Sequence, residues 1–359
     1  MKTLFSVFTA IFPLVVLGGV IFFINTSNPP KTPEQTTDTT PLPELETTKA
    51  EPQLQWAKIA EEIPWHVRDS HGTAVFKDKI WVMGGLGGQP KQTEYWAMPH
   101  FSDVWSSMDG TIWEFITEAA PWGERRSLPI IVFQNKLWLM GGWDNKSWTY
   151  PEDVWNTEDG IIWNQVAAKV PWQGREGHTI TEYQGKLWLS GGVRFDTRET
   201  FNDVWVSEDG ITWELITEAA PWTSRYDHTI TAFQDMLWLI GGVPIGGGHA
   251  TNDIWTSANG KDWERVTEHA EFPVRHGHNT EVWNNELWIV SGWNTLEGKG
   301  NRDIWHSADG INWLKIPGQT PWLGREDHGV VIFQDKLWVL GGMDENWTWN
   351  NDVWSAELR

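Results

Sequence analysis

Residues that can do acid–base chemistry recur at one position of a repeated pattern. An arginine precedes a histidine by three residues at Arg68/His71, Arg175/His178, Arg225/His228, Arg275/His278 and Arg325/His328, whereas another copy reads Arg125-Arg126-Ser127-Leu128. The residues in between vary, and include Asp69, Arg126, Glu176, Tyr226, Asp227, His276, Glu326 and Asp327. Carboxyl groups near a tyrosine and a histidine can exchange protons with a sugar. Candidate catalytic residues are therefore Glu176, Asp227, Glu326 and Tyr226; a solvated acidic rim is the alternative.

Five histidines in equivalent positions raise the question of a metal site. One histidine per repeat would lie on separate sheets, too far apart to share an ion that binds nitrogen at about 2 Å. The histidine also recurs with the rest of the repeat, which favours structural hydrogen bonding. We therefore predict neither a metal site nor a cofactor. The arginines are expected to pair with the aspartates of six Asp-x-Trp triplets, at Asp103, Asp153, Asp203, Asp253, Asp303 and Asp352.

Tryptophan is the compositional outlier, with 30 copies. Most of them occupy positions that recur in every repeat, where packing explains them. Six stand apart in the loops that precede the Asp-x-Trp triplets: Trp96, Trp143, Trp148, Trp293, Trp347 and Trp349. Exposed planar rings suit the apolar faces of sugars or the side chains of a partner. Packing of these rings within their own loops is the alternative.

The elements that carry these residues form a repeat of about 50 residues. Gly-Gly or Ser-Gly ends an apolar run at Gly84, Gly141, Gly191, Gly241, Ser291 and Gly341, at intervals of 57, 50, 50, 50 and 50 residues. In one repeat we predict strands at 178–183, 186–190, 203–207 and 211–216, with Asp209-Gly210 as a tight hairpin turn. No stretch has helical periodicity. Each repeat is therefore a four-stranded antiparallel sheet whose two apolar faces need neighbours.

The Gly-Gly element followed by spaced aromatics on the third and fourth strands resembles the kelch-repeat family. The resemblance covers residues 54–359 and implies an all-β, six-bladed kelch-type propeller. The last repeat lacks a fourth strand, and Gln55–Ile59 matches the fourth strand Thr212–Ile216. We therefore predict that the N-terminal strand closes the last blade. Copper-radical galactose oxidases are also kelch propellers, but their cofactor needs a cysteine cross-linked to tyrosine, and this chain has no cysteine.

The N-terminal segment differs from the repeats. Residues 4–24 are 21 uncharged positions, and a membrane-spanning helix needs roughly 20. A signal anchor or transmembrane helix is predicted within residues 1–26, with a cleaved signal peptide as the alternative. Residues 27–53 are a Pro/Thr-rich linker. Lys2 before the span places the propeller outside the cytoplasm.

Function is predicted from one face of the propeller. Loops between second and third strands emerge on the side of the inter-repeat connections, which we call the looped face; tight turns occupy the opposite, plain face. We predict a binding module for a glycan or polysaccharide, with the six loop tryptophans and Tyr95, Arg126, Arg194 and His276 as ligand-binding residues. The alternatives are a carbohydrate-active mutarotase, isomerase or lyase, and a module that binds a cell-surface protein. A charge of 27 − 48 = −21 excludes a nucleic-acid partner.

Overall fold

The computed structural model describes residues 52–60, 63–88, 97–246 and 248–359. Residues Ala50–Arg359 form one compact unit. The described residues contain strands and no α-helix, and therefore no helix long and apolar enough to cross a membrane. The predicted span at residues 4–24 lies outside them, as do Tyr95 and Trp96.

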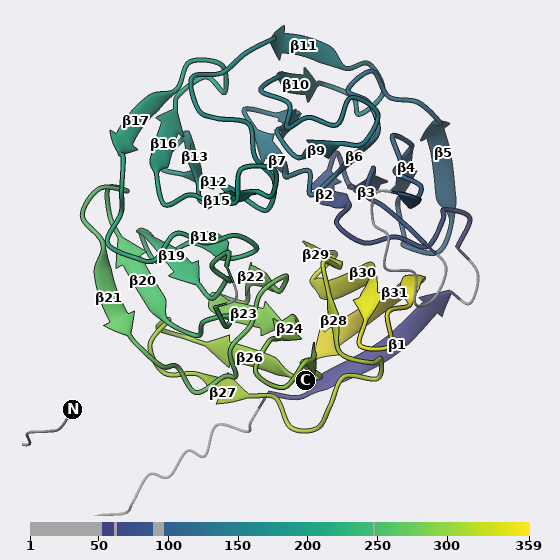
Figure 1. Cartoon of the computed structure of the whole chain (residues 1–359). Helices are drawn as coiled ribbons and strands as arrows, with labels where there is room; N and C mark the ends of the chain where they lie inside the picture. The colour runs from purple at the N-terminus through teal and green to yellow at the C-terminus, as the bar shows by residue number, and fades with distance from the viewer. Residues whose placement is uncertain (1–51, 61–62, 89–96, 247) are drawn as a thin grey trace, which may run out of the picture. The chain divides into compact units, whose positions relative to one another are not determined.

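Six antiparallel sheets are arranged as the blades of a propeller (Figure 1). From hub to rim the strands are β2 (Gly72–Phe76), β3 (Lys79–Met83), β4 (Val104–Ser107) and β5 (Trp113–Thr117) in blade 1; β7 (Ile130–Phe133), β8 (Lys136–Met140), β10 (Val154–Thr157) and β11 (Asn164–Ala167) in blade 2; and β12 (Thr179–Tyr183), β13 (Lys186–Ser190), β16 (Val204–Ser207) and β17 (Glu214–Thr217) in blade 3.

The second half of the ring repeats this order. The strands are β18 (Thr229–Phe233), β19 (Met236–Ile240), β20 (Ile254–Ser257) and β21 (Glu264–Thr267) in blade 4; β22 (Asn279–Trp283), β23 (Glu286–Val290), β26 (Ile304–Ser307) and β27 (Leu314–Lys315) in blade 5; and β29 (Gly329–Phe333), β30 (Lys336–Asp344), β31 (Trp349–Leu358) and β1 (Leu54–Ala60) in blade 6. Because β1 pairs with β31, the predicted closure of the last blade by the N-terminal strand is confirmed.

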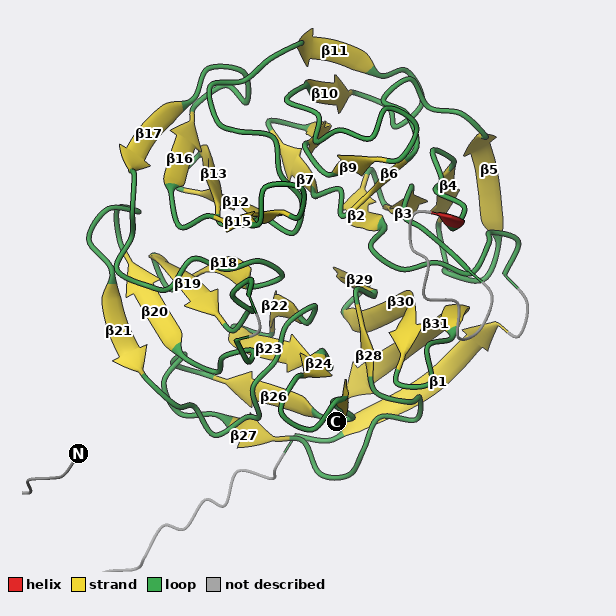
Figure 2. Cartoon of the chain, viewed as in Figure 1, coloured by secondary structure: helices red, strands yellow, loops and turns green. Residues whose placement is uncertain are grey.

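Short strand pairs that involve loop residues lie on the looped face (Figure 2). They are β6 (Arg125–Arg126) with β9 (Trp143–Asp144), β14 (Val193–Arg194) with β15 (Glu199–Thr200), β24 (Trp293–Asn294) with β25 (Lys299–Gly300), and β28 (Arg325–Glu326) with β30.

The predicted strand boundaries of blade 3 agree with the structure to within one residue, except at the start of the fourth strand. The fourth strand of blade 3 begins at Glu214, not at Ile211. The Asp209 carboxylate accepts hydrogen bonds from the backbone N–H groups of Ile211 and Thr212, both within 2.8 Å. These two residues are therefore held in the hairpin turn and do not pair with the third strand. Gly210, at φ 76°, supplies the left-handed conformation expected there.

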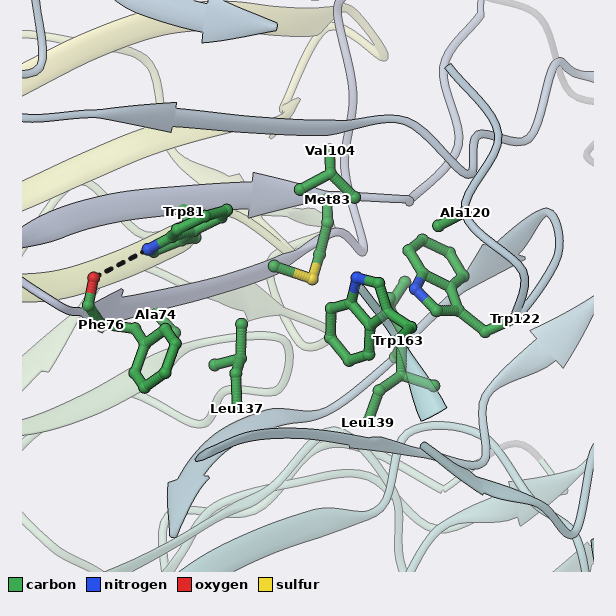
Figure 3. Packing of buried hydrophobic residues seen from close by; sticks show 11 residues of the cluster. Ala74, Phe76, Trp81, Met83, Val104, Ala120, Trp122, Leu137, Leu139 and Trp163 are labelled. Carbon is green, nitrogen blue, oxygen red and sulfur yellow. Dashed lines mark hydrogen bonds between the residues drawn. The ribbon is translucent and has the colours of Figure 1, made fainter. Parts of the chain in front are cut away.

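The hydrophobic core consists of one cluster at each interface between adjacent blades. Figure 3 shows the cluster between blades 1 and 2, which contains Trp81 and Met83 from blade 1 and Leu139 and Trp163 from blade 2. The Trp81 indole N–H donates to the Phe76 carbonyl at 2.8 Å, so its polar atom is satisfied inside the core. Burying one large apolar side chain stabilises a fold by roughly 1.5–3 kcal/mol. The recurrent tryptophans therefore hold the ring together and leave the loops available for function.

Candidate functional site

A buried ion pair fixes the start of the segment that carries the candidate residues. In blade 1 the Arg68 guanidinium donates to both Asp103 carboxylate oxygens at 2.7 Å and to the Gly84 carbonyl at 2.8 Å. Equivalent pairs join Arg125 to Asp153, Arg175 to Asp203, Arg225 to Asp253, Arg275 to Asp303 and Arg325 to Asp352. The predicted arginine–aspartate pairing is confirmed. Two-point contacts of this kind fix orientation as well as distance, so the residues that follow each arginine begin from a rigid point.

The residue immediately after each arginine lies on the looped face around the central axis. We call these six residues the outer ring: Asp69, Arg126, Glu176, Tyr226, His276 and Glu326. Each one pairs in antiparallel register with the residue after the Gly-Gly or Ser-Gly element of its blade, namely Leu86, Trp143, Val193, Val243, Trp293 or Met343. This pairing holds the outer-ring backbone in place without help from a ligand.

The next residue in each repeat forms a narrower ring, which we call the neck ring: Ser70, Ser127, Gly177, Asp227, Gly277 and Asp327. All six have a left-handed backbone, with φ between 46° and 62°. The N–H of Asp227 donates to the Gly177 carbonyl at 2.9 Å, and that of Gly277 to the Asp227 carbonyl at 3.0 Å. Similar bonds join Asp327 to Gly277, Ser70 to Asp327 and Ser127 to Ser70. Backbone hydrogen bonds between blades therefore hold the neck.

The two rings enclose a cavity of about 400 Å³ at the axis, which we call the mouth cavity. Its lining brings together six of the residues named from sequence: Arg126, Glu176, Tyr226, Asp227, His276 and Glu326. Asp69 and Asp327 add two more carboxyl groups. Sequence reasoning did not select Phe195, Leu86, Val193 or Met343, which form the apolar part of the wall. The only signal for Phe195 was an aromatic residue beside Arg194 in a loop of the looped face.

Carboxyl groups are the most numerous ionisable groups of the mouth cavity. Arg126 makes a two-point ion pair with Glu176, at 2.9 and 3.2 Å. The His276 Nδ1 atom lies 3.7 Å from an Asp227 carboxylate oxygen and 3.6 Å from one of Glu326. Asp327 accepts a hydrogen bond from the Ser70 hydroxyl at 3.0 Å. The cavity therefore contains five carboxyl groups, one guanidinium and one imidazole.

Burial and crowding shift the titration of these groups. Burial, reinforced by the Glu326 charge, raises the pKa of Asp69 to about 8. Burial also raises the pKa of Glu326 to about 7, against the opposing charge of His276. Burial and the charges of Asp227 and Glu326 raise the pKa of Asp327 well above its ordinary value. At His276 burial disfavours the charged form, but the Asp227 and Glu326 carboxylates outweigh it and raise the imidazole pKa.

Among the described aromatic side chains of the loops, Phe195 lines the mouth cavity, whereas Trp143, Trp148, Trp293 and Trp347 do not. Trp148, Phe195 and Trp347 are 60%, 46% and 38% exposed. Trp143 packs edge-on against Trp148 and Tyr150, and Trp293 packs edge-on against Trp347 from the neighbouring blade. Arg194 pairs with Asp196 at 2.8 Å and lies over the Tyr150 ring.

The expectation that Trp349 presents a stacking platform is wrong. Its side chain is 3% exposed, since it packs with Leu86, Met98 and Met343 beneath the loops of blades 1 and 6. Trp96 and Tyr95, the remaining loop aromatics named from sequence, lie outside the described residues.

A family comparison agrees with this geometry. The KLHDC2/KLHL20/DRC7 Kelch-repeats domain model matches residues 127–342. The chain belongs to the kelch-repeat family. No curated protein matches this kelch propeller. Kelch propellers are a common protein-interaction module, and this chain is a propeller of that kind.

The histidines of the kelch propeller lie below the neck ring, beside a second cavity of about 190 Å³. Each ring packs at a blade interface; His178, for example, lies against Trp172 of its own blade and Gly141 of the preceding one. Burial lowers the pKa of His71, His178, His228 and His328 to about 3, so these side chains are neutral. Within the described residues, no group of three or more histidine or acidic side chains is placed to hold a metal ion.

Proposed function

We propose that this kelch propeller is a binding module that takes a glycan in the mouth cavity of its looped face. The observation that carries the proposal is the composition of that cavity. Its floor consists of hydrogen-bonding side chains from the outer and neck rings, and its wall contains Phe195 and aliphatic residues. A sugar unit has the complementary combination of hydroxyl groups and apolar faces, and a cavity of about 400 Å³ is within the size range of ligand sites.

The backbone of the surrounding loops supports the same proposal. Trp148, Arg198 and Trp347 have left-handed φ angles of 58°, 58° and 59°. The corresponding loop of blade 5 uses Gly298 at φ 64°, where no strain arises. A bulky residue in this conformation costs about 1–2 kcal/mol. Two tryptophans that are both strained and exposed contribute little to the fold, so a role in contacting a ligand accounts for them better.

The experiment is a binding screen of the full chain in detergent micelles against a panel of oligosaccharides. We expect binding to fall at least tenfold when both exposed rings are removed in the variant Trp148→Gly/Trp347→Gly, because glycine suits both backbone positions. The matched control is Phe115→Ala, which removes an exposed ring from the outer strand β5. Failure of every oligosaccharide to bind would overturn the glycan proposal and favour a protein partner.

A second candidate function is a carbohydrate-active enzyme of the mutarotase, isomerase or lyase type. It is favoured by the Glu326–His276–Asp227 cluster, in which the imidazole lies within 3.7 Å of both carboxyl groups. A pKa of about 7 at Glu326 suits a group that gives and takes protons near neutrality. Turnover of a bound glycan that is lost in Glu326→Gln, while binding remains, would establish this function.

The location of the propeller is part of the proposal. The uncharged run at residues 4–24 supports a membrane anchor, and Lys2 before it supports export of the propeller. A reporter enzyme that is active only outside the cytoplasm, fused after Arg359, tests this arrangement. An inactive reporter on an intact fusion protein would contradict export.

A further inference from the structure

The carboxyl groups of the mouth cavity outnumber its cationic partners. The guanidinium of Arg126 is already engaged by Glu176 in a two-point pair. His276 is the other cationic candidate, and it lies between Asp227 and Glu326. Asp69 and Asp327 therefore form no ion pair in the cavity, and the Arg126 charge lowers the pKa of Asp69 by less than burial and Glu326 raise it. Groups of like charge in a low-dielectric site raise each other's cost of ionisation. A bound cation would therefore lower the cost of ionising the four carboxyl groups other than Glu176.

One carboxylate oxygen of the cavity is buried without a hydrogen-bond donor. Asp69 is 3% exposed, yet its Oδ1 atom has no hydrogen-bond partner. An acceptor left unpaired in a buried site costs about 1–3 kcal/mol. This unpaired oxygen is independent of the charge count, and it indicates a ligand that brings a hydrogen-bond donor with it.

The neck ring is built to hold two of the carboxyl groups in place. A Cβ atom at Gly177 would lie 2.6 Å from an Asp227 carboxylate oxygen, and one at Gly277 would lie 2.8 Å from the corresponding oxygen of Asp327. The missing side chains at these two glycines therefore make room for the aspartates of the following blades. This arrangement fixes Asp227 and Asp327 in the floor of the mouth cavity.

We propose that the mouth cavity binds a protonated primary amine carried by an amino sugar of the glycan. An ammonium group supplies one positive charge and three N–H donors, which matches both deficits. Phe195 and Tyr226, whose rings contact each other edge-on in the wall, offer apolar surface to the sugar ring. The inference rests on the proposed glycan-binding function and specifies its substrate class.

The test compares two probes that differ in one feature. A β-1,4-linked glucosamine tetramer carries free amines, and its fully N-acetylated counterpart has the same sugars and linkages without the charge. Binding of both to the full chain in detergent micelles is measured by calorimetry at neutral pH. We expect the amine form to bind at least tenfold more tightly. The variant Asp227→Asn/Asp327→Asn should reduce this preference to within twofold.

Controls separate binding from folding. The matched control is Asp78→Asn, which neutralises an exposed aspartate in a tight turn on the plain face; it should leave the preference unchanged. Thermal melting of the double variant checks that the fold survives, and asparagine tolerates the left-handed conformation of the neck ring. The single variant Asp69→Asn provides a second route if the double variant does not fold, and it should also weaken amine binding.

Each outcome bears on one of the two proposals. Equal binding of both tetramers would overturn the amino-sugar inference and leave the glycan-binding function standing. Binding of neither tetramer, together with a negative oligosaccharide screen, would overturn both. A preference for the amine form that survives in the aspartate variants would place the amine elsewhere and overturn the inference. A tri-lysine peptide serves as a further probe: binding as tight as that of the amine tetramer would assign the site to a protein partner instead of a sugar.

Discussion

At the scale of single residues, Trp148 and Trp347 are positions whose side chains contribute little to the fold. Both rings are exposed, and both backbones adopt the left-handed conformation in which a Cβ atom is crowded. Trp148 contacts Trp143 edge-on, but most of its surface faces solvent. Packing at this exposed position does not offset the strain. We therefore expect the loops of blades 2 and 6 to contact the proposed ligand.

Replacing Trp148 by glycine tests the strain directly. Glycine has no Cβ atom to crowd at φ 58°, whereas alanine keeps it. We expect the free energy of unfolding of Trp148→Gly to be about 1 kcal/mol higher than that of Trp148→Ala. Urea denaturation of the two variants measures this difference. At an unstrained helix or strand position the order would be reversed. A more stable alanine variant would show that the left-handed backbone at this position does not limit stability.

Glu326 links the mouth cavity to the pH dependence of stability. Its pKa is about 7 in the folded protein, against an ordinary value of 4.5. The titratable groups that interact with it are Asp69, Asp227, Asp327, Tyr226 and His276. Between these two pKa values the folded protein keeps a proton that the unfolded chain has lost. The stabilisation is therefore complete below pH 4.5 and disappears as the pH rises through 7.

We expect Glu326→Gln to remove this dependence, because glutamine does not titrate. The melting temperature of the unsubstituted protein relative to the variant should fall as the pH rises from about 4.5 to about 7.5. Thermal melts in low-salt buffers measure it, and Glu357→Gln, at an exposed position on β31, is the control. A constant difference across this range would contradict the raised pKa.

The site was predictable from sequence only where its residues break the repeat. Asp69, Arg126, Glu176, Tyr226, His276 and Glu326 vary at a position flanked by residues that recur in the repeats, and the structure places all of them in the outer ring. Asp227 and Asp327 were named from sequence, but the neck ring as a whole was not predicted, because its defining property is a left-handed backbone and a hydrogen bond to another blade. Neither Ser70 nor Gly177 signals that by residue type. Trp349 was misassigned because local position does not reveal that loops from two blades meet over it.

At the scale of elements, the hub strands each begin beside a buried histidine, except in blade 2. In blade 2, Leu128 occupies the position of this histidine. It packs against Gly84 of blade 1, as His178 packs against Gly141 of blade 2. The predicted structural hydrogen bonding of the repeat histidines is confirmed at His278, whose Nε2 atom lies 3.3 Å from the Thr229 hydroxyl. It is wrong for His178, whose ring nitrogens have no hydrogen-bond partner. Its contribution is packing between blades, which leucine supplies equally well.

We expect His178→Leu to make the propeller more resistant to acid. The pKa of His178 is about 3 in the folded protein against an ordinary 6.5, so the unfolded chain takes up a proton first as the pH falls. Stability from the neutral histidine is complete above pH 6.5 and is lost as the pH falls toward 3. The variant should gain melting temperature relative to the unsubstituted protein between pH 7.5 and pH 5, measured by circular dichroism. A gain of equal size at both pH values would point to packing alone.

Strand order was predictable because each strand is short, apolar and bounded by turn residues. The error at the fourth strand of blade 3 has a local cause, since the side chain of Asp209 competes with the ladder for the N–H groups of Ile211 and Thr212. Sequence patterns score alternating apolar residues and do not detect this competition. The effect moved a boundary and left the number and order of strands unchanged.

For the whole molecule, the stability of the ring depends on its closure by β1. This strand pairs with β31 from Leu54 opposite Leu358 to Ala60 opposite Val353. Trp56 contacts Trp322 edge-on in the core between blades 5 and 6, while Ile59 packs into the core between blades 6 and 1. One strand thus contributes to two interfaces and covers the edge of β31.

We expect deletion of residues 54–60 to lower the free energy of unfolding by more than about 5 kcal/mol. Loss of several partly buried apolar side chains at roughly 1.5–3 kcal/mol each, together with a row of unpaired backbone groups, is comparable to the total stability of a domain. Blades 1 and 6 have no other covalent connection, so their interface would open and unfolding would lose its cooperativity. A truncation that removes only residues 1–49, outside the compact unit Ala50–Arg359, is the control and should melt as the full chain does. A single cooperative transition at an unchanged temperature in the 54–60 deletion would show that the ring holds together through its interblade cores alone.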